Sequence, residues 1–198
     1  MSPLVVDRYL SSFIREDLSK KMVFVGGPRQ VGKTSLALSL HPFYLNWDDI
    51  EQRRKILSKD WPKTTRIITF DEIHKYARWR NLLKGYYDTQ RQTHSFLVTG
   101  SARLDHYRKG GDSLLGRYHY YRLHPFSLPE AGYKKSALER LLKFGGFPEP
   151  FLHGDERGHR RWQLERLERV IREDLRDLER VREITLIERL AEALPDRV

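Results

Sequence analysis

The sequence lacks cysteine and long apolar runs, and each absence excludes a class of protein. Without cysteine there are no disulfide bonds and no thiolate metal ligands, which fits a reducing compartment. The apolar runs are only a few residues long, too short to span a bilayer. The first residues, MSPLVVDRYL, have no basic region followed by an apolar core, so we expect no secretory signal. These absences together predict a soluble cytoplasmic protein without membrane contact.

Charge of one sign is in excess. The 198 residues include 37 Lys and Arg against 27 Asp and Glu, which leaves a net charge of +10. A basic surface attracts polyanions at long range, so nucleic acid is a plausible partner. A solvated basic surface is the equally good alternative, since proteins that handle nucleotides also carry such a surplus.

Short apolar runs alternate with helical patterns through the first two thirds of the chain. The predicted helices cover residues 8–19, 33–40, 49–58 and 78–89. The predicted strands cover residues 21–25, 43–47, 66–70, 95–99 and 118–123. Strands that alternate with helices of this length predict an α/β fold, a parallel sheet covered by helices on both sides.

The pattern changes after residue 123. The Gly/Pro breaker GGFPEP occupies residues 145–150, and residues 156–182 form a dense Arg/Glu helical pattern with leucines at spacings of three and four. We therefore expect a core of residues 1–132 followed by a helical extension of residues 133–198. A charged amphipathic helix of this kind is either a docked surface helix or one that reads nucleic acid.

The segment GGPRQVGKTSL, residues 26–36, is a predicted phosphate loop. It matches G-x-x-x-x-G-K-[ST], follows an apolar strand and opens a helix, which is the context that gives the pattern its meaning. Backbone N–H groups in such a loop converge on one anion, and the following helix adds its positive end. Lys33 would reach the outer phosphates, and the Thr34 hydroxyl would bind Mg²⁺. The expected nucleotide-binding residues are Gly27, Pro28, Arg29, Gln30, Val31, Gly32, Lys33, Thr34 and Ser35.

Two adjacent carboxylates end a later apolar strand, in IITFDEIHK at residues 67–75. In phosphate-loop enzymes the acid at this strand end holds the magnesium, a role that falls on Asp71. The next carboxylate, Glu72, can orient or deprotonate a water that attacks the terminal phosphate, which favours hydrolysis. The alternative is that both acids only cap a helix that begins at Ile73.

Two further polar residues are candidates for the catalytic site. Ser101 follows the strand at 95–99, and parallel strands end at the edge that lines a ligand crevice; Thr99 is the other hydroxyl candidate there. A turn with helix-cap residues explains that segment equally well. Arg117 precedes the last strand, and its guanidinium could neutralise charge on the transferred phosphoryl group, within its own subunit or across an interface. An ordinary surface arginine is the alternative.

The motifs GPRQVGKTS, FDEIHK, TGSARLD, DSLLGRY, LHPFSLPE and GGFPEP, in that order, resemble the AAA-type ATPase family of bacteria and archaea whose core precedes a C-terminal domain of unknown function. The resemblance covers about residues 7–194. It implies a P-loop NTPase sheet of order 5-1-4-3-2, with ATP as the nucleotide. The implied roles are phosphate and magnesium binding at Lys33 and Thr34, magnesium at Asp71, water activation at Glu72, a polar sensor at Ser101 and an arginine finger or sensor at Arg117.

The resemblance has two further implications. GGFPEP looks like the Gly-x-Pro element through which related signal-transduction ATPases couple nucleotide state to the next domain. Family members continue past the point where this sequence stops, so it looks like an ATPase core with only the first helices of its partner domain.

The sequence thus supports a magnesium-dependent ATPase that acts as a nucleotide-driven conformational switch or motor, with a homo-oligomer that forms through Arg117 as one possibility. The alternative is a DNA-binding module in which the nucleotide is mainly structural or regulatory. A small-molecule kinase is less favoured, because Glu72 suits water activation and no lid for an acceptor is evident. The eight histidines show no ligand-like pairing, so no metal besides nucleotide-bound Mg²⁺ is expected.

Overall fold

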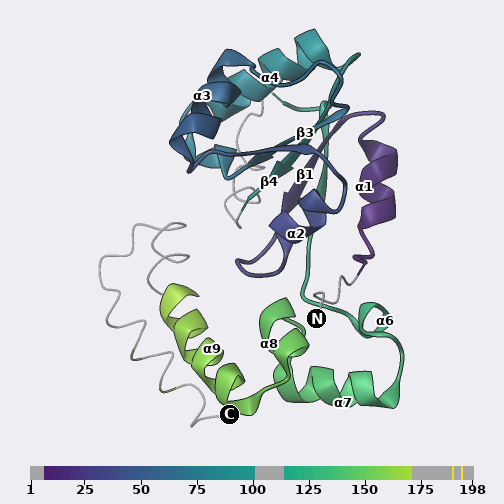
Figure 1. Ribbon diagram of the computed structural model, residues 1–198, viewed down its shortest axis with the longest axis vertical. Coiled ribbons are helices and arrows are strands. Elements are labelled where there is room, and N and C mark those ends of the chain that lie inside the picture. The colour runs from purple at the N-terminus through teal and green to yellow at the C-terminus, as the bar shows by residue number, and fades with distance from the viewer. Residues whose placement is uncertain (1–6, 101–113, 171–188, 190–192, 194–198) are drawn as a thin grey trace.

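The fold is built on one parallel sheet (Figure 1). A computed structural model describes residues 7–100, 114–170, 189 and 193. Within these residues all strand pairs are parallel and the order is β2-β3-β4-β1-β5, which confirms the predicted α/β P-loop arrangement. The strands are β1 Met22–Gly26, β2 Phe43–Asn46, β3 Ile67–Asp71, β4 Ser95–Thr99 and β5 Tyr118–Arg122.

Helices cover both faces of this sheet, as the alternating pattern predicts. Successive β1 side chains point to opposite faces: Met22 and Phe24 join one buried cluster, Val23 and Val25 the other. α3 (Ile50–Ser58) and α4 (Trp79–Gln90) pack on the first face. α1 (Ser11–Asp17) and α2 (Lys33–Leu38) pack on the second. The two clusters fix the sheet and therefore the positions at which its strands end.

The first helix is shorter than predicted and buries a narrower stripe. It begins at Ser11 rather than at residue 8. Leu10, Ile14 and Leu18 are buried at spacings of four, whereas Phe13 is 54% exposed. The sequence pattern places Leu10, Phe13, Ile14 and Leu18 on one helical face, so it finds the buried stripe but assigns one residue too many to it.

Among the described residues, four helices follow the sheet: α6 Leu128–Ala131, which ends the predicted core, and α7 Lys135–Phe144, α8 Pro148–His153 and α9 Glu156–Arg169, which belong to the predicted extension. In Figure 1 they lie below the sheet, with α8 and α9 under the loop that precedes α2. α6 starts with a reciprocal capping box between Ser127 and Glu130. The extension is thus placed at the edge of the sheet where the phosphate loop lies.

The described part of the charged helix does not pack as its leucine spacing predicts. Trp162 is the buried residue of α9 and lies 5.2 Å from the Phe147 ring, measured between centroids. Leu164 is 72% exposed and Leu167 is 42% exposed. The aromatic side chain therefore supplies the packing face of α9. Residues 171–182 of the predicted helix lie outside the described residues.

Within the described part of the chain, we find no helix with the length and apolar character that a membrane span requires.

Candidate functional site

The loop between β1 and α2 is curled by residues with positive φ. Gly27 has φ 145°, Gln30 has φ 62° and Gly32, which immediately precedes α2, has φ 95°. A Cβ atom on Gly27 would lie 2.4 Å from the Leu123 carbonyl oxygen, so only glycine fits there. The glycines of the motif are therefore required by the shape of the loop.

Lys33 is held inside this loop. Lys33 is only 8% exposed. Its Nζ donates hydrogen bonds to the carbonyl oxygens of Gly27 (3.0 Å) and Pro28 (2.8 Å). The ammonium thus lies within the turn of backbone that the sequence predicts to surround phosphate. An anion bound in the loop would meet this positive charge directly.

Asp71, at the end of β3, accepts hydrogen bonds from three hydroxyl groups. Its Oδ2 accepts from Thr34 Oγ1 at 3.0 Å and from the Tyr44 hydroxyl at 2.5 Å, and its Oδ1 accepts from Thr99 Oγ1 at 2.7 Å. The register places Asp71 opposite Asn46 of β2 and Thr99 of β4. Because strand ends of a parallel sheet meet at one edge, residues far apart in sequence converge next to the phosphate loop.

Tyr44 is a site residue that the sequence analysis did not identify. Burial first, and then the hydrogen bond to Asp71, raise the pKa of its phenol well above the usual value. The phenol therefore keeps its proton and remains a donor to the carboxylate at neutral pH.

The oxygen atoms of Thr34 and Asp71 fit a magnesium ion at the mouth of the loop. Mg²⁺ prefers hard oxygen ligands and, with a bound polyphosphate, takes only one or two of them from the protein. The residues described here contain no group of three or more His, Cys, Asp and Glu that could hold a metal by themselves. A hydroxyl and a carboxylate 3.0 Å apart match the smaller donor set.

Glu72 follows in the left-handed region, with φ 56°, and its N–H donates to the Thr99 carbonyl at 3.0 Å. A short 3₁₀ helix, η1 Ile73–Lys75, begins after it, but the Glu72 side chain makes no cap hydrogen bond. Its Oε2 instead lies 3.3 Å from Lys75 Nζ and 3.7 Å from His74 Nε2. The structure thus gives no support to the capping alternative for Glu72.

The environment of Glu72 shifts the pKa of its carboxyl upward. Burial raises the pKa of this carboxyl above its usual value; the Lys75 ammonium opposes the shift and Asp71 adds to it. A carboxylate with a raised pKa is a better proton acceptor than an exposed one, which is the property expected of a general base.

These side chains line a cleft of about 520 Å³. Two lining positions come from α8, which the sequence did not place here, and Lys75 is a third addition. Gly27, Pro28 and Val31 shape the loop without lining the cleft. The lining residues are Arg29, Gln30, Gly32, Lys33, Thr34, Ser35, Asp71, Glu72, Lys75, Pro148 and Glu149.

Arg8 connects the phosphate loop to α6 and to the segment after β5, another feature that the sequence did not reveal. Its guanidinium donates to the Val31 carbonyl at 2.8 Å, to Glu130 Oε1 at 2.7 Å and to the His124 carbonyl. It also lies 4.7 Å from the centroid of the Phe126 ring. One buried side chain thereby holds the phosphate loop, the segment after β5 and α6 together.

The last two candidates do not join the cleft. Arg117 lies at the amino end of β5, where its carbonyl accepts from Met22 N, whereas the phosphate loop follows the opposite end of β1. Its guanidinium pairs with Asp88 at 2.8 Å. The structure therefore separates Arg117 from the cleft of its own subunit. Ser101 lies outside the described residues.

A comparison with known families agrees with the fold and the geometry of the phosphate loop. The profile of a family described as AAA domain matches residues 19–132, more than half of the chain. The chain belongs to this family. A second profile, described as a domain of unknown function (DUF8612), matches residues 135–198. The resemblance to an AAA-type ATPase followed by a C-terminal domain of unknown function is thus confirmed, and the class is that of nucleotide-binding AAA-type ATPases.

Among solved structures, the chain is similar to a Signal Transduction ATPase with Numerous Domains protein with a tetratricopeptide repeat sensor from Pyrococcus horikoshii. The sequences are 17% identical and the TM-score is 0.44. The match covers 68% of this chain but 28% of that one, so this chain spans well under a third of the length of that protein. None of the curated proteins matches the chain.

Proposed function

We propose that the protein binds ATP with Mg²⁺ and hydrolyses it, with the core of residues 1–132 as the hydrolytic unit. The observation that carries the proposal is the 3.0 Å contact between Thr34 and Asp71 at the mouth of the phosphate loop. It joins the two residues that phosphate-loop enzymes use for the metal. Glu72, with its raised pKa, stands one residue further on the rim of the same cleft.

Each residue of the cleft has a role that follows from its position. The loop amides and Lys33 bind and orient the phosphates. Thr34 and Asp71 hold the magnesium, which when bound supplies neutralisation of phosphate charge. Glu72 orients the attacking water and accepts its proton. Ser101 as a polar sensor remains part of the proposal, on the strength of its motif alone.

We propose further that the protein is a nucleotide-driven switch whose extension, residues 133–198, responds to the state of the cleft. The support is the position of α8, which supplies Pro148 and Glu149 to the cleft lining. A ligand shifts a conformational equilibrium only through contacts that differ between the two states. Residues of the extension that line the nucleotide cleft can make such contacts.

Two substitutions test the proposed chemistry. Lys33→Ala should reduce ATP affinity at least about 100-fold, because the loop loses the ammonium that its own turn of backbone holds for the outer phosphates. Glu72→Gln should leave ATP affinity close to that of the parent and lower turnover about 100-fold or more, because water loses its base. Titration calorimetry and a phosphate-release assay measure the two effects.

The controls are matched in charge, and neither of them lines the cleft. Lys135→Ala changes a side chain that is 90% exposed on α7, and Glu51→Gln changes one that is 73% exposed on α3. Both should behave as the parent does. If Glu72→Gln hydrolyses ATP at the rate of the parent, the role of Glu72 is wrong.

A second proposal, a DNA-binding module in which nucleotide is structural, draws on the +10 charge and on α9, which exposes Arg157, Arg160, Arg161 and Arg169. If the protein has this function, its affinity for DNA should fall steeply as the salt concentration rises, because binding releases counterions from the DNA phosphates. Affinity that is high, salt-dependent and indifferent to ATP would favour this function over the switch.

A further inference from the structure

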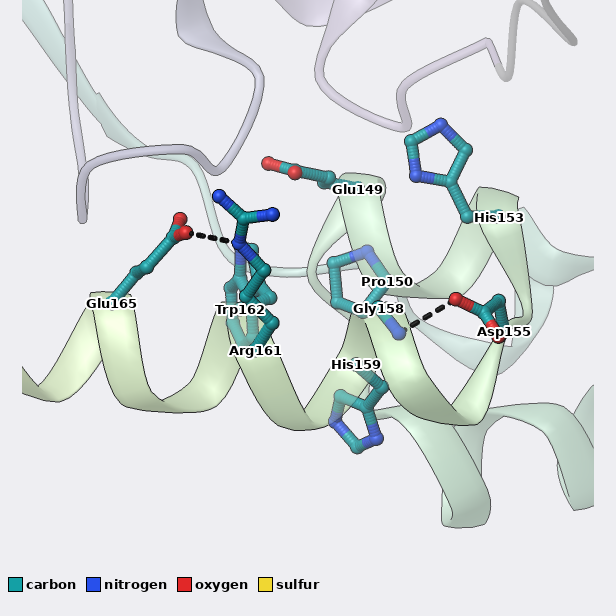
Figure 2. A pocket seen from close by; sticks show the side chains of 9 residues that line it. All are labelled: Glu149, Pro150, His153, Asp155, Gly158, His159, Arg161, Trp162 and Glu165. Carbon is teal, nitrogen blue, oxygen red and sulfur yellow. Dashed lines mark hydrogen bonds and ion pairs between the residues drawn. The ribbon is translucent and has the colours of Figure 1, made fainter.

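Glu149 is shared by two cavities. It is the second residue of α8 and lines the phosphate cleft. It also lines a cavity of about 570 Å³ between α8 and α9. In Figure 2 its side chain extends from the start of α8 into the space between these helices and the overlying ribbon of the core. A carboxylate of the extension thus stands at the edge of an anion-binding loop.

The start of α8 packs against the phosphate loop. A Cβ atom on Gly32 would lie 3.6 Å from Pro148 Cγ and 3.4 Å from Arg8 Nη1, both ordinary contact distances. Because Glu149 directly follows Pro148, it lies at the mouth of the loop and lines the same cleft. Any movement of α8 away from Gly32 also moves the carboxylate.

Within the described residues, the Glu149 carboxylate has no partner of opposite charge. It is exposed, and among the described residues it makes no hydrogen bond or ion pair. The other two acids of the cleft are occupied: Asp71 by three hydroxyl donors, and Glu72 by Lys75. Glu149 is therefore the acid whose charge is available to the cleft.

An unpaired carboxylate at this place has opposite effects in the two states of the cleft. Without nucleotide, the loop amides and the Lys33 ammonium form a positive field that attracts it. With a triphosphate in the loop, two groups of like charge face each other across the cleft, which raises the free energy of the bound state. The same side chain thus favours docked α8 without nucleotide and disfavours it with nucleotide.

We propose that Glu149 is an acidic competitor of the nucleotide phosphates. It holds α8 against the phosphate loop in the absence of ATP, and the terminal phosphates displace it. α9 follows this movement, because Phe147, at the start of α8, packs on Trp162 at 5.2 Å and lies under the Arg166 guanidinium at 3.8 Å. The inference rests on the proposed nucleotide function and names the group through which the extension responds.

Glu149→Gln in the whole chain tests it, because the amide keeps the shape of the side chain and removes the charge. We expect the variant to bind ATP about 3–10-fold more tightly at low salt, with the larger gain for ATP without Mg²⁺, whose charge is higher. The gain should shrink as salt rises, since the cleft is open to solvent. Titration calorimetry with ATP, with and without Mg²⁺, measures it.

Glu139→Gln is the matched control, because Glu139 is a 64% exposed acid on α7 whose partner is Lys135. It should bind ATP as the parent does. Hydrogen exchange of the α8 amides gives a second readout: ATP should raise it in the parent, and Glu149→Gln should raise it without ATP.

Each outcome decides between the two proposals. A parent protein that binds no ATP would overturn the nucleotide function itself. A parent that binds ATP, with Glu149→Gln equal to it in affinity and exchange, would overturn the role of Glu149 alone. Weaker binding of Mg²⁺-ATP by Glu149→Gln would also overturn it, since Glu149 would then help to hold the metal.

Discussion

At the scale of single residues, the site depends on a buried carboxylate satisfied by neutral groups. Asp71 is 4% exposed and accepts from Thr34, Tyr44 and Thr99. Burial of a charge is costly unless hydrogen bonds replace its water. Three hydroxyls from α2, β2 and β4 make this replacement and also fix the orientation of both carboxylate oxygens. The carboxylate is therefore held in place before any metal arrives.

Tyr44→Phe should weaken this arrangement. It removes a donor to a charged group, so we expect the free energy of unfolding to fall by about 1.5–3 kcal/mol. The Mg²⁺ dependence of ATP binding should change as well, because one oxygen of Asp71 loses a partner. Chemical denaturation and calorimetry at several Mg²⁺ concentrations give the two values.

Tyr121→Phe is the matched control for this prediction. The Tyr121 hydroxyl donates to Asp17 at 2.5 Å, the same kind of bond at the same length, but away from the cleft. It should lower stability without a change in Mg²⁺ dependence. Equal effects of the two variants on Mg²⁺ dependence would contradict a specific role for Tyr44.

At the scale of elements, the strands were predictable because buried parallel strands are short apolar runs that require helical crossovers. Their order was implied by the resemblance to the AAA-type ATPase family. The phosphate loop was predictable because its glycines and lysine are adjacent in sequence. The contact of Arg8 with Glu130 and the shared cleft of Pro148 and Gly32 bring together residues more than a hundred positions apart. No local pattern encodes such pairs, so tertiary packing alone reveals them.

Helix faces were predictable only in part. Regular spacing identified Leu10, Ile14 and Leu18, yet it also selected Phe13 and the exposed leucines of α9. Spacing defines a stripe, but the width of the buried stripe depends on what packs against it. In α9 the buried residue is Trp162, and the leucines are exposed. The division of the chain at residue 132 stays a prediction.

Arg8 is the residue that joins the phosphate loop to α6 and to the segment after β5. Its side chain is 6% exposed and that of Glu130 is 3% exposed. Arg8→Ala would leave this carboxylate buried without its charged partner, so we expect a loss of about 3–5 kcal/mol in the free energy of unfolding. Chemical denaturation measures this loss.

Arg54→Ala is the control for this prediction. It breaks an ion pair with Glu51 in which both side chains are 73% exposed, and should lower the free energy of unfolding by less than about 1 kcal/mol. Similar losses in the two variants would show that the Arg8 contacts are not structural.

At the scale of the whole molecule, the position of Arg117 decides how it can serve catalysis. It lies at the opposite edge of the sheet from the cleft, so a catalytic role requires the nucleotide of another subunit. Mixing Arg117→Ala with Glu72→Gln should then restore turnover that neither variant has alone, because each supplies what the other lacks. A phosphate-release assay at increasing protein concentration measures the rescue. Additive, unrescued rates would assign Arg117 to its pair with Asp88 alone.

The placement of Arg117 and the phosphate loop at opposite strand ends also constrains symmetry. A subunit that supplies its arginine from one end and receives a neighbour's arginine at the other can contact its neighbours head to tail. Repeated head-to-tail contacts of this kind close into a ring or continue as a helical filament. The terminal subunit of any open array would then hold a nucleotide that lacks its neighbour's arginine, and hydrolysis there would lag behind the interior.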